Sequence, residues 1–172
     1  TWKSYNEEDL IHFPMIIKPR KGYRSVDVHL VHDKSNLNQK ISCIKNPIIQ
    51  EYIGNEKTEY TCGVIAFDGD VKTSIVLNRT LKDGNTHTTS LRADFPKVIK
   101  DYIESVSSKL NQFGVCNFQL RIDEGEPKIF EINARHSGTT YIRSLYGFNE
   151  VEYILEYILN NKEIDFDLKE GK

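Results

Sequence analysis

The chain has 172 residues and a net charge of −2, with 38% hydrophobic and 28% charged residues. This length can bury a core, and this composition is typical of a soluble globular protein rather than a disordered one. No run of Lys and Arg indicates a nucleic-acid surface, and no apolar run approaches the roughly 20 residues that cross a bilayer. We therefore expect neither a nucleic-acid partner nor a membrane span.

The three cysteines, Cys43, Cys62 and Cys116, are widely spaced and form no CxxC pair. An odd, sparse set is typical of free thiols in a reducing compartment, not of a disulfide framework or a zinc site. We predict a cytoplasmic protein. Because the chain lacks an initiator Met and runs directly into a strand, we also expect a fragment whose upstream residues are missing.

The first 53 residues predict a small lobe of strands and one short helix. Apolar runs bounded by polar clusters, Pro and Gly indicate strands, and Asp33 or Ser35 can cap the helix. In chain order we expect a strand at 13–19, a basic loop at 20–25, a strand at 26–31, a helix at 35–42 and a strand at 47–53. Residues 54–58 have the composition of a turn or linker. We place a boundary there, between a lobe at 1–53 and a lobe at 54–172.

The second lobe predicts longer strands and two amphipathic helices. The turn signal Asp-Gly at 68–69 separates two strands, and apolar residues recur at helical spacing in two later segments. In chain order we expect strands at 59–67 and 71–81, a mobile polar loop at 82–94, a helix at 96–113, strands at 115–123 and 127–134, and a helix at 151–159.

The last two strands form a hairpin with one polar face. Along the first strand, Asn117, Gln119 and Arg121 alternate with apolar residues. With Gly125 at the centre of the turn, antiparallel counting places Gln119 opposite Glu131. The same register places Asn117 opposite Asn133, Phe118 opposite Ile132, and Leu120 opposite Phe130 on the core side, where Ala134 continues the apolar row.

The polar face of this hairpin suits a divalent cation. Gln119, Glu131 and Asn133 would project oxygen atoms into one small volume, which suits a hard ion such as Mg²⁺. Arg135 beside them would supply a fixed positive fork for an anionic oxygen. The alternative is a solvated face of an edge hairpin, since antiparallel sheets commonly expose one face to water.

Upstream residues could hold a nucleotide. Lys18 ends an apolar strand next to a flexible basic loop with Gly22, which suits phosphate. Glu51 and Glu59 flank the linker, where a crevice between lobes favours small molecules, and either could accept hydrogen bonds from ribose or adenine. The alternative is that these cations and carboxylates are solvated surface residues.

The ordered set IIKP, a basic Gly loop, QEYIG…TEYT and FQL…IFEINAR resembles an ATP-grasp domain. It is most similar to the ATP-binding units of the carbamoyl phosphate synthetase large subunit and their single-domain relatives, over roughly residues 13–145. The resemblance implies an α+β fold, in which two lobes with mainly antiparallel sheets grip the nucleotide between them. It also implies ATP and Mg²⁺ as cofactors, with Mn²⁺ as an alternative to Mg²⁺.

The resemblance assigns roles to individual residues. Arg135 and Arg79 would contact the transferred phosphoryl group or the substrate, while the roles of His87 and His136 stay open. The implied nucleotide contacts are Lys18, Lys21, Gly22 and Ser25 at the phosphates, Gln50, Glu51, Tyr52 and Ile53 at adenine, and Glu59 at ribose; the implied metal ligands are Gln119, Glu131 and Asn133. The loop departs from the family because Gly22 is its single glycine, and the Rossmann-like domain that usually precedes an ATP-grasp core is absent.

The implied activity is that of a carboxylate–amine ligase, or a carboxylate–thiol ligase. A small-molecule carboxylate would take the γ-phosphate of ATP to give an acyl phosphate, and an amine would then displace phosphate. The missing N-terminal domain would act in cis. The alternatives are a non-catalytic ATP-binding module, acting as a sensor or scaffold, and a purely structural α+β domain. Nothing in the sequence names the carboxylate, the nucleophile or the oligomeric state.

Overall fold

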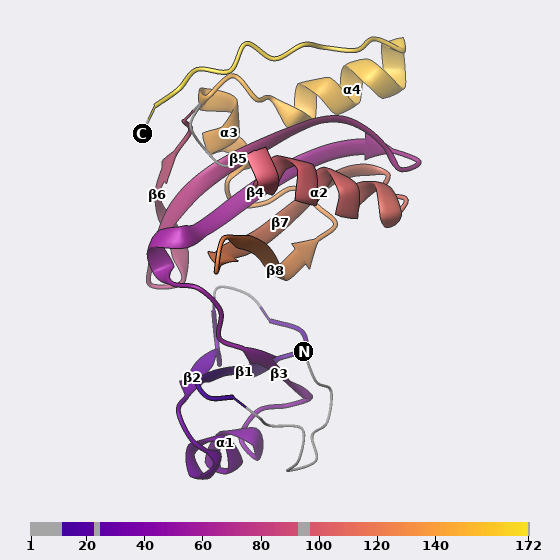
Figure 1. The fold of residues 1–172 in the computed structure, drawn as a ribbon. Helices are drawn as coiled ribbons and strands as arrows, with labels where there is room; N and C mark the ends of the chain where they lie inside the picture. Colours follow the sequence, from indigo (N-terminus) through magenta and orange to yellow (C-terminus); the bar gives the residue numbers. More distant parts are fainter. Residues whose placement is uncertain (1–11, 23–24, 93–96, 172) are drawn as a thin grey trace. The chain divides into compact units, whose positions relative to one another are not determined.

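The computed structural model describes residues 12–22, 25–92 and 97–171 of the chain (Figure 1). The chain divides into two compact units: unit 1 is Thr1–Ile53 with Lys82–Asn85, and unit 2 is Gly54–Leu81 with Thr86–Lys172. Each unit has its own antiparallel sheet and its own core, so each is described separately. No helix of the described residues is long and apolar enough to cross a membrane.

Unit 1 contains a three-stranded antiparallel sheet and one helix. Its elements are β1 (Met15–Pro19), β2 (His29–Val31), α1 (Lys34–Ile41) and β3 (Pro47–Glu51), and the strand order is β2-β1-β3. Asp33 caps α1, because its Oδ1 accepts a hydrogen bond from the amide of Asn36 at 2.8 Å. The core side chains of this unit are Met15, Ile17, Val31, Leu37, Ile44 and Ile49. The structure confirms three strands and one helix in this part of the chain, and all three strands are shorter than predicted.

The strand β2 starts later than the alternation in residues 26–31 predicts. Ser25 and Asp27 adopt φ angles of 55° and 58°. These angles lie outside the β region, so an extended strand cannot run through these two residues. Residues 25–28 therefore belong to the loop that follows Gly22, and the loop is longer than predicted.

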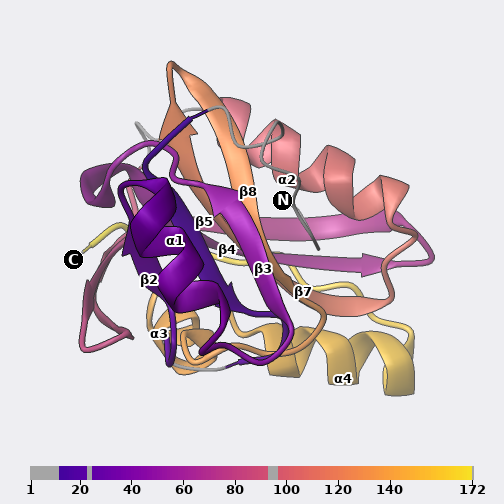
Figure 2. The ribbon, with the colours of Figure 1, turned by 90° about the horizontal axis from the view of Figure 1, so that it is seen from below.

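Unit 2 is a five-stranded antiparallel sheet with helices on both faces. Its strands are β4 (Glu59–Phe67), β5 (Asp70–Lys82), β6 (Asn85–Ser90), β7 (Gly114–Asp123) and β8 (Glu126–Asn133), in the order β6-β5-β4-β7-β8. Its helices are the short η2 (Glu56–Thr58), α2 (Lys97–Lys109), α3 (Thr140–Leu145) and α4 (Glu150–Asn160). Figure 2 shows α2 and α4 on opposite sides of this sheet. The short helices η2 and α3 were not predicted from the sequence.

The two faces of the unit 2 sheet carry separate cores. The core on the α2 face contains Tyr60, Cys62, Val64, Ile99, Ile103, Cys116, Phe118 and Leu120. The core on the other face, under α3 and α4, contains Ile65, Phe67, Ile75, Leu77, Leu91, Val115, Tyr146, Phe148 and Tyr153. Side chains alternate along a strand. The residues of β4 and β7 that lie between the members of the first core therefore point to the second face of the sheet.

This second face changes from apolar to polar along β4 and β7. From the apolar end to the polar end, the facing pairs are Ile65–Val115, Gly63–Asn117, Thr61–Gln119 and Glu59–Arg121. The core under α3 and α4 includes the first of these pairs and none of the others. One end of the sheet face is therefore packed with apolar side chains, and the other end is lined by polar ones.

The prediction of a mobile polar loop at 82–94 is wrong, because these residues contain β6. Asp83 and Gly84 adopt φ angles of 52° and 73°, the backbone of a tight hairpin turn. The Oγ1 atoms of Thr80 on β5 and Thr88 on β6 lie 2.6 Å apart. An edge strand rich in Thr can pair through its backbone without an apolar face, so its polar composition concealed it.

The β7–β8 hairpin differs from the predicted register between its turn and Leu120. Its turn residues are Glu124 and Gly125, with φ angles of 51° and 85°, so the centre of the turn lies between these two residues. From this turn the register pairs Leu120 with Ile129 instead of Phe130. The predicted Leu120–Phe130 pair is therefore wrong, because the turn lies earlier than predicted. A β-bulge at Phe130 then adds one residue to β8 and restores the predicted register from Gln119 and Glu131 onward.

The apolar row predicted on β8 is only partly buried. Ile132 faces Phe118 as predicted, but it is 45% exposed, and Ala134 is also exposed. The strand β8 lies at the edge of the sheet, so little chain covers it. Ile129 packs against the core in the place predicted for Phe130.

Candidate functional site

The polar row of the β7–β8 hairpin converges on the carboxylate of Glu131. Gln119 lies directly opposite Glu131, and Asn117 lies opposite Asn133, so the predicted register is confirmed at this row. Nε2 of Gln119 donates to Oε1 of Glu131 at 3.3 Å, and Nδ2 of Asn133 donates to the same oxygen at 2.6 Å. The three side chains predicted as metal ligands therefore meet at one oxygen atom.

The bulge in β8 brings this row into register. The centre of the turn between Glu124 and Gly125 would, without an extra residue, place Phe130 opposite Gln119. Glu131 would then point to the other face of the sheet, because a shift of one residue reverses every side chain. The extra residue offsets the earlier turn and returns Glu131 to the polar face.

The carboxylate of Glu59 holds two arginines. Glu59 is 3% exposed, and its Oε1 accepts from Nε and Nη2 of Arg79 at 3.0 and 2.7 Å. Its Oε2 accepts from Nε and Nη2 of Arg121 at 3.0 and 2.8 Å. The predicted ribose contact of Glu59 does not fit this arrangement, since both oxygens of this buried carboxylate are engaged by guanidinium groups.

Arg79 connects the Glu59 cluster to the polar row. It is 8% exposed, and its Nη2 also donates to Oε1 of Gln119 at 2.8 Å. A chain of hydrogen bonds thus runs from Arg121 through Glu59, Arg79 and Gln119 to Glu131. The sequence singled out Arg79, but it left Arg121 without a role, although alternation already placed Arg121 on the same face as Gln119.

Arg135 lies at the other end of the row. Its Nη2 donates to Oδ1 of Asn133 at 3.3 Å, and its Nη1 donates to the carbonyl of His136 at 2.9 Å. Arg135 is an exposed residue, unlike Arg79. The two predicted catalytic arginines therefore approach the row from opposite ends, one buried and one exposed.

A cavity of about 90 Å³ in unit 2, here called the pocket, joins these groups. Its lining residues are Thr61, Arg79, Thr86, Asn117, Gln119, Asn133, Arg135, Ser137, Gly138 and Thr139. Two guanidinium groups and several hydroxyls in one polar pocket suit an anionic oxygen group, since arginine offers several donors in a fixed plane. The sequence did not single out Gly138 and Thr139, although they closely follow Arg135 and His136.

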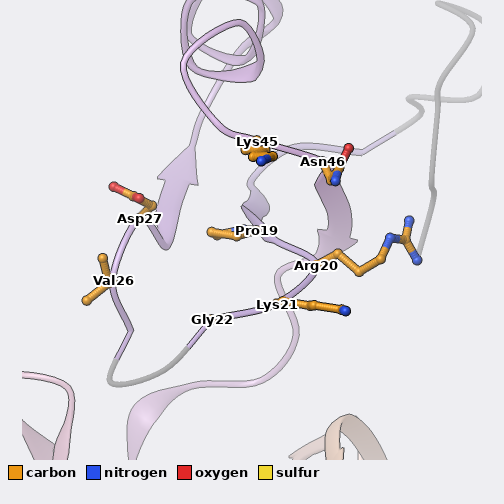
Figure 3. A pocket seen from close by; sticks show the side chains of 8 residues that line it. All are labelled: Pro19, Arg20, Lys21, Gly22, Val26, Asp27, Lys45 and Asn46. Carbon is orange, nitrogen blue, oxygen red and sulfur yellow. The ribbon is translucent and has the colours of Figure 1, made fainter.

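The basic loop of unit 1 borders a second, larger cavity of about 700 Å³. Figure 3 shows Arg20 and Lys21 on one flank and Val26 and Asp27 on the other. The lining residues are Pro19, Arg20, Lys21, Gly22, Val26, Asp27, Lys45 and Asn46. Of the predicted phosphate contacts, Lys21 and Gly22 line this cavity, and Lys18 and Ser25 are not among its lining residues.

The other predicted nucleotide residues of unit 1 lie on β1, on β3 and just beyond β3. Gln50 faces Ile16, which is two residues from Lys18 in β1, so Lys18 and Gln50 share one face of the sheet. Met15 and Ile17 point to the other face, which carries the core with α1. The four predicted adenine residues at this strand end are Gln50, Glu51, Tyr52 and Ile53.

The cysteines supply no reactive group to either cavity. All three are free, and Cys62 and Cys116 are buried. Burial raises the pKa of Cys62 to about 12 and that of Cys116 to about 11, so both stay protonated at neutral pH and are poor nucleophiles. Within the described residues, no group of three or more His, Cys, Asp and Glu side chains could hold a metal.

Similar proteins share both sequence and fold with this chain. The D-alanine–D-alanine ligase of Bacillus anthracis is 26% identical over 145 residues, which are 76% of this chain and 46% of the ligase. The chain thus spans about half the length of the curated relatives it matches.

Solved structures establish the fold at lower identity. The L-amino acid ligase of Bacillus licheniformis superposes with a TM-score of 0.71 at 18% identity, over 93% of this chain and 43% of that one. The biotin carboxylase domain of the Hydrogenobacter thermophilus 2-oxoglutarate carboxylase, in complex with MgADP and bicarbonate, gives a TM-score of 0.75 at 12% identity, over 95% and 40%.

A family model covers most of the chain. The family described as "ATP-grasp in the biosynthetic pathway with Ter operon" matches residues 44–171. This stretch contains Gln119, Glu131, Asn133 and the complete pocket. The resemblance to ATP-grasp domains is confirmed, and the chain belongs to this ATP-grasp family.

Proposed function

We propose that this chain is the ATP-grasp part of a ligase that uses Mg·ATP to activate a carboxylate as an acyl phosphate and then joins it to an amine. The observation that carries this function is the convergence of Gln119 and Asn133 on Glu131, beside Arg79 and Arg135. The names of the relatives support the reaction class, since they include a D-alanine–D-alanine ligase and an L-amino acid ligase. The rest of a longer protein would supply the other part of the substrate site.

Gln119, Glu131 and Asn133 would hold the metal ion. The set offers a carboxylate and two amide groups, and each amide carries an oxygen on a soft terminal torsion. Oxygen ligands of this kind suit Mg²⁺, and Mn²⁺ prefers the same ligands and could replace it. The metal would neutralise charge on the phosphates of ATP. A structural neighbour in complex with MgADP supports this assignment.

The nucleotide contacts complete the proposal. We assign residues 1–53 to the small ATP-grasp lobe and residues 54–172 to the large one. In the small lobe, Lys18, Lys21, Gly22 and Ser25 would contact phosphate oxygens, and Gln50, Glu51, Tyr52 and Ile53 would contact adenine. Three free thiols favour a reducing compartment and therefore a cytoplasmic location.

The arginines would act on the phosphoryl group. A substrate carboxylate oxygen attacks the γ-phosphorus, the bond to ADP breaks, and the amine then attacks the acyl carbon and releases phosphate. Arg79 and Arg135 would hold the negatively charged oxygens in line during both steps, which is the main task of protein groups in phosphoryl transfer. Glu59 would orient Arg79 through its two hydrogen bonds.

The test replaces the carboxylate at the centre of the row. We expect Glu131→Ala to keep the melting temperature of the wild type and to lose Mg·ATP-dependent ADP release, because the metal loses its charged ligand. The control is Glu126→Ala, an exposed carboxylate on the same strand. The assay uses the full-length protein with a panel of carboxylates and amines.

Three outcomes separate the alternatives. ADP release by the wild type and not by Glu131→Ala supports the proposed ligase. Thermal stabilisation by Mg·ATP without ADP release for any pair in the panel would indicate a binding module. A melting temperature that does not respond to Mg·ATP would indicate a structural domain.

A further inference from the structure

Unit 2 contains a buried ion pair that the proposed mechanism does not use. Arg143 of α3 and Glu150 of α4 are both 0% exposed, and Nη1 of Arg143 donates to Oε2 of Glu150 at 3.0 Å. Burying two charges costs desolvation energy, and well-packed apolar side chains often stabilise a fold equally well. A pair of this kind therefore calls for an explanation beyond stability.

The arginine end of the pair touches the sheet wall of the pocket. Nη2 of Arg143 donates to Oδ1 of Asn117 and, at 3.5 Å, to Oγ1 of Thr61. Thr61 in turn donates to Oδ1 of Asn117 at 3.0 Å. Both residues line the pocket. The guanidinium lies directly on β4 at Gly63, where a Cβ atom would come within 2.7 Å of Nη1 of Arg143.

The position of Arg143 coincides with the change in character of the sheet face. The pair Gly63–Asn117 lies between the apolar pair Ile65–Val115 and the pocket-lining pair Thr61–Gln119. The guanidinium therefore occupies the border between the core under α3 and α4 and the pocket.

The glutamate end of the pair holds the loop on the other side of the pocket. Oε1 of Glu150 accepts a hydrogen bond from Oγ1 of Thr140, and it lies 3.1 Å from Nδ1 of His136. Oγ1 of Thr140 also accepts from the amide of Ser137 at 3.1 Å. Ser137 begins the segment 137–139 that lines the pocket. Thr140 thus links the buried carboxylate to the pocket wall.

The protonation state of Glu150 fits this task. Burial by itself raises the pKa of Glu150, but the charge of Arg143 and the hydrogen bonds from Thr140, His136 and Arg143 outweigh burial and hold the pKa below its ordinary value. Glu150 is therefore an anion at neutral pH and accepts all these hydrogen bonds. Nδ1 of His136 accordingly acts as the donor in its contact with Glu150.

We propose that the Arg143–Glu150 pair is a positioning device for the pocket, which holds the segment 137–139 at a fixed place relative to Thr61 and Asn117 on the sheet. The inference rests on the proposed function, and it adds Arg143, Glu150 and Thr140 to the residues on which that function depends. None of the three lines the pocket, so each acts through the residues it holds. A displacement of about 1 Å at a reacting group can cost a hundredfold in rate.

The test uses Thr140, because removing either charge of a fully buried pair endangers the fold. We expect Thr140→Val to lower the turnover number for ADP release roughly ten- to a hundredfold, with KM for ATP within about twofold of the wild type. Thr140→Ser keeps the hydroxyl and should restore turnover. The control, Ser144→Ala, removes a hydroxyl on the same helix that donates only to the carbonyl of Tyr141.

The outcomes distinguish this inference from the proposed function. Loss of turnover in Thr140→Val, with rescue in Thr140→Ser and a wild-type rate in Ser144→Ala, supports the positioning role. A wild-type rate in Thr140→Val overturns the inference and leaves the proposed function intact, and so does a loss that Thr140→Ser does not restore. A wild-type protein that releases no ADP overturns both.

Discussion

Two buried carboxylates flank the pocket, and they bind different kinds of partner. Glu59 holds Arg79 and Arg121, which belong to the strands β5 and β7. Glu150 holds Arg143 and Thr140 of the helix α3, together with His136 of the segment that precedes this helix. The partners of Glu59 are already aligned by the backbone ladder of the sheet, whereas no ladder aligns the partners of Glu150.

The two clusters also differ in their access to water. The side chains of Arg79 and Arg121 are 9% and 14% exposed, whereas that of Arg143 is 0% exposed. An arginine that keeps some exposure can recover hydration when its carboxylate is lost, and a fully buried one cannot. The comparison indicates that Glu59 mainly orients guanidinium groups, while Glu150 mainly fixes the path of the chain.

The largest expected effect is a difference in stability between variants of these two carboxylates. We expect Glu150→Gln to reduce the free energy of unfolding by about 3–5 kcal/mol, because Arg143 is left as an uncompensated buried charge. Glu59→Gln should cost less, about 1–3 kcal/mol, because its arginines lie closer to water. Urea unfolding of both variants measures the difference. Equal losses in the two variants would show that the two carboxylates do not differ in this way.

An acid titration gives a smaller effect on the Glu150 side. The pKa of Glu150 in the folded chain lies below its ordinary value of 4.5. As the pH falls, the Glu150 carboxylate therefore takes up a proton in the unfolded chain before it does so in the folded chain. The contribution of Glu150 to stability is complete above about pH 5, and it is lost as the pH falls through the pKa of the folded chain. We expect the difference in unfolding free energy between wild type and Glu150→Gln to shrink below about pH 5.

The measurement is urea unfolding of both proteins at a series of pH values. The pKa of Asp123 is also lowered, mainly by the hydrogen bond that Lys128 donates to its carboxylate. Because Asp123 titrates in both proteins, its effect cancels in the difference. A difference that stays constant down to pH 3 would mean that folding leaves the pKa of Glu150 unchanged, so that Arg143 and the hydrogen bonds do not lower it.

The sequence predicted the polar row of the β7–β8 hairpin better than the surroundings of Glu150. Alternation along β7 and β8 placed Gln119, Glu131 and Asn133 together, because strand periodicity carries directly into space. The Arg143–Glu150 pair was not predicted. Helix α3 is too short for a periodic pattern, and a glutamate at the start of α4 is usual on electrostatic grounds alone.

The edge of the sheet shows a second limit of sequence patterns. The alternation that reveals a half-buried strand is absent in β6, whose polar residues pair through the backbone at the edge. The predicted register at Glu131 is also correct for a reason that alternation did not supply, because two differences from the predicted hairpin cancel there. The turn lies earlier than expected, and the bulge at Phe130 compensates, because the turn centre and the bulge each depend on local backbone angles that alternation does not encode.

The smallest expected effect concerns this bulge and the Glu59 cluster. Phe130, displaced from the core, has its ring centroid 5.9 Å from the guanidinium carbon of Arg121. A cation–π contact at a partly exposed site contributes about 0.5–1 kcal/mol, and Leu would keep the apolar bulk without the ring. We expect Phe130→Leu to lower the free energy of unfolding by about that amount. In Glu59→Gln the guanidinium is less firmly held, so the same change should cost less there; an equal cost in both backgrounds would show that Phe130 acts independently of the cluster.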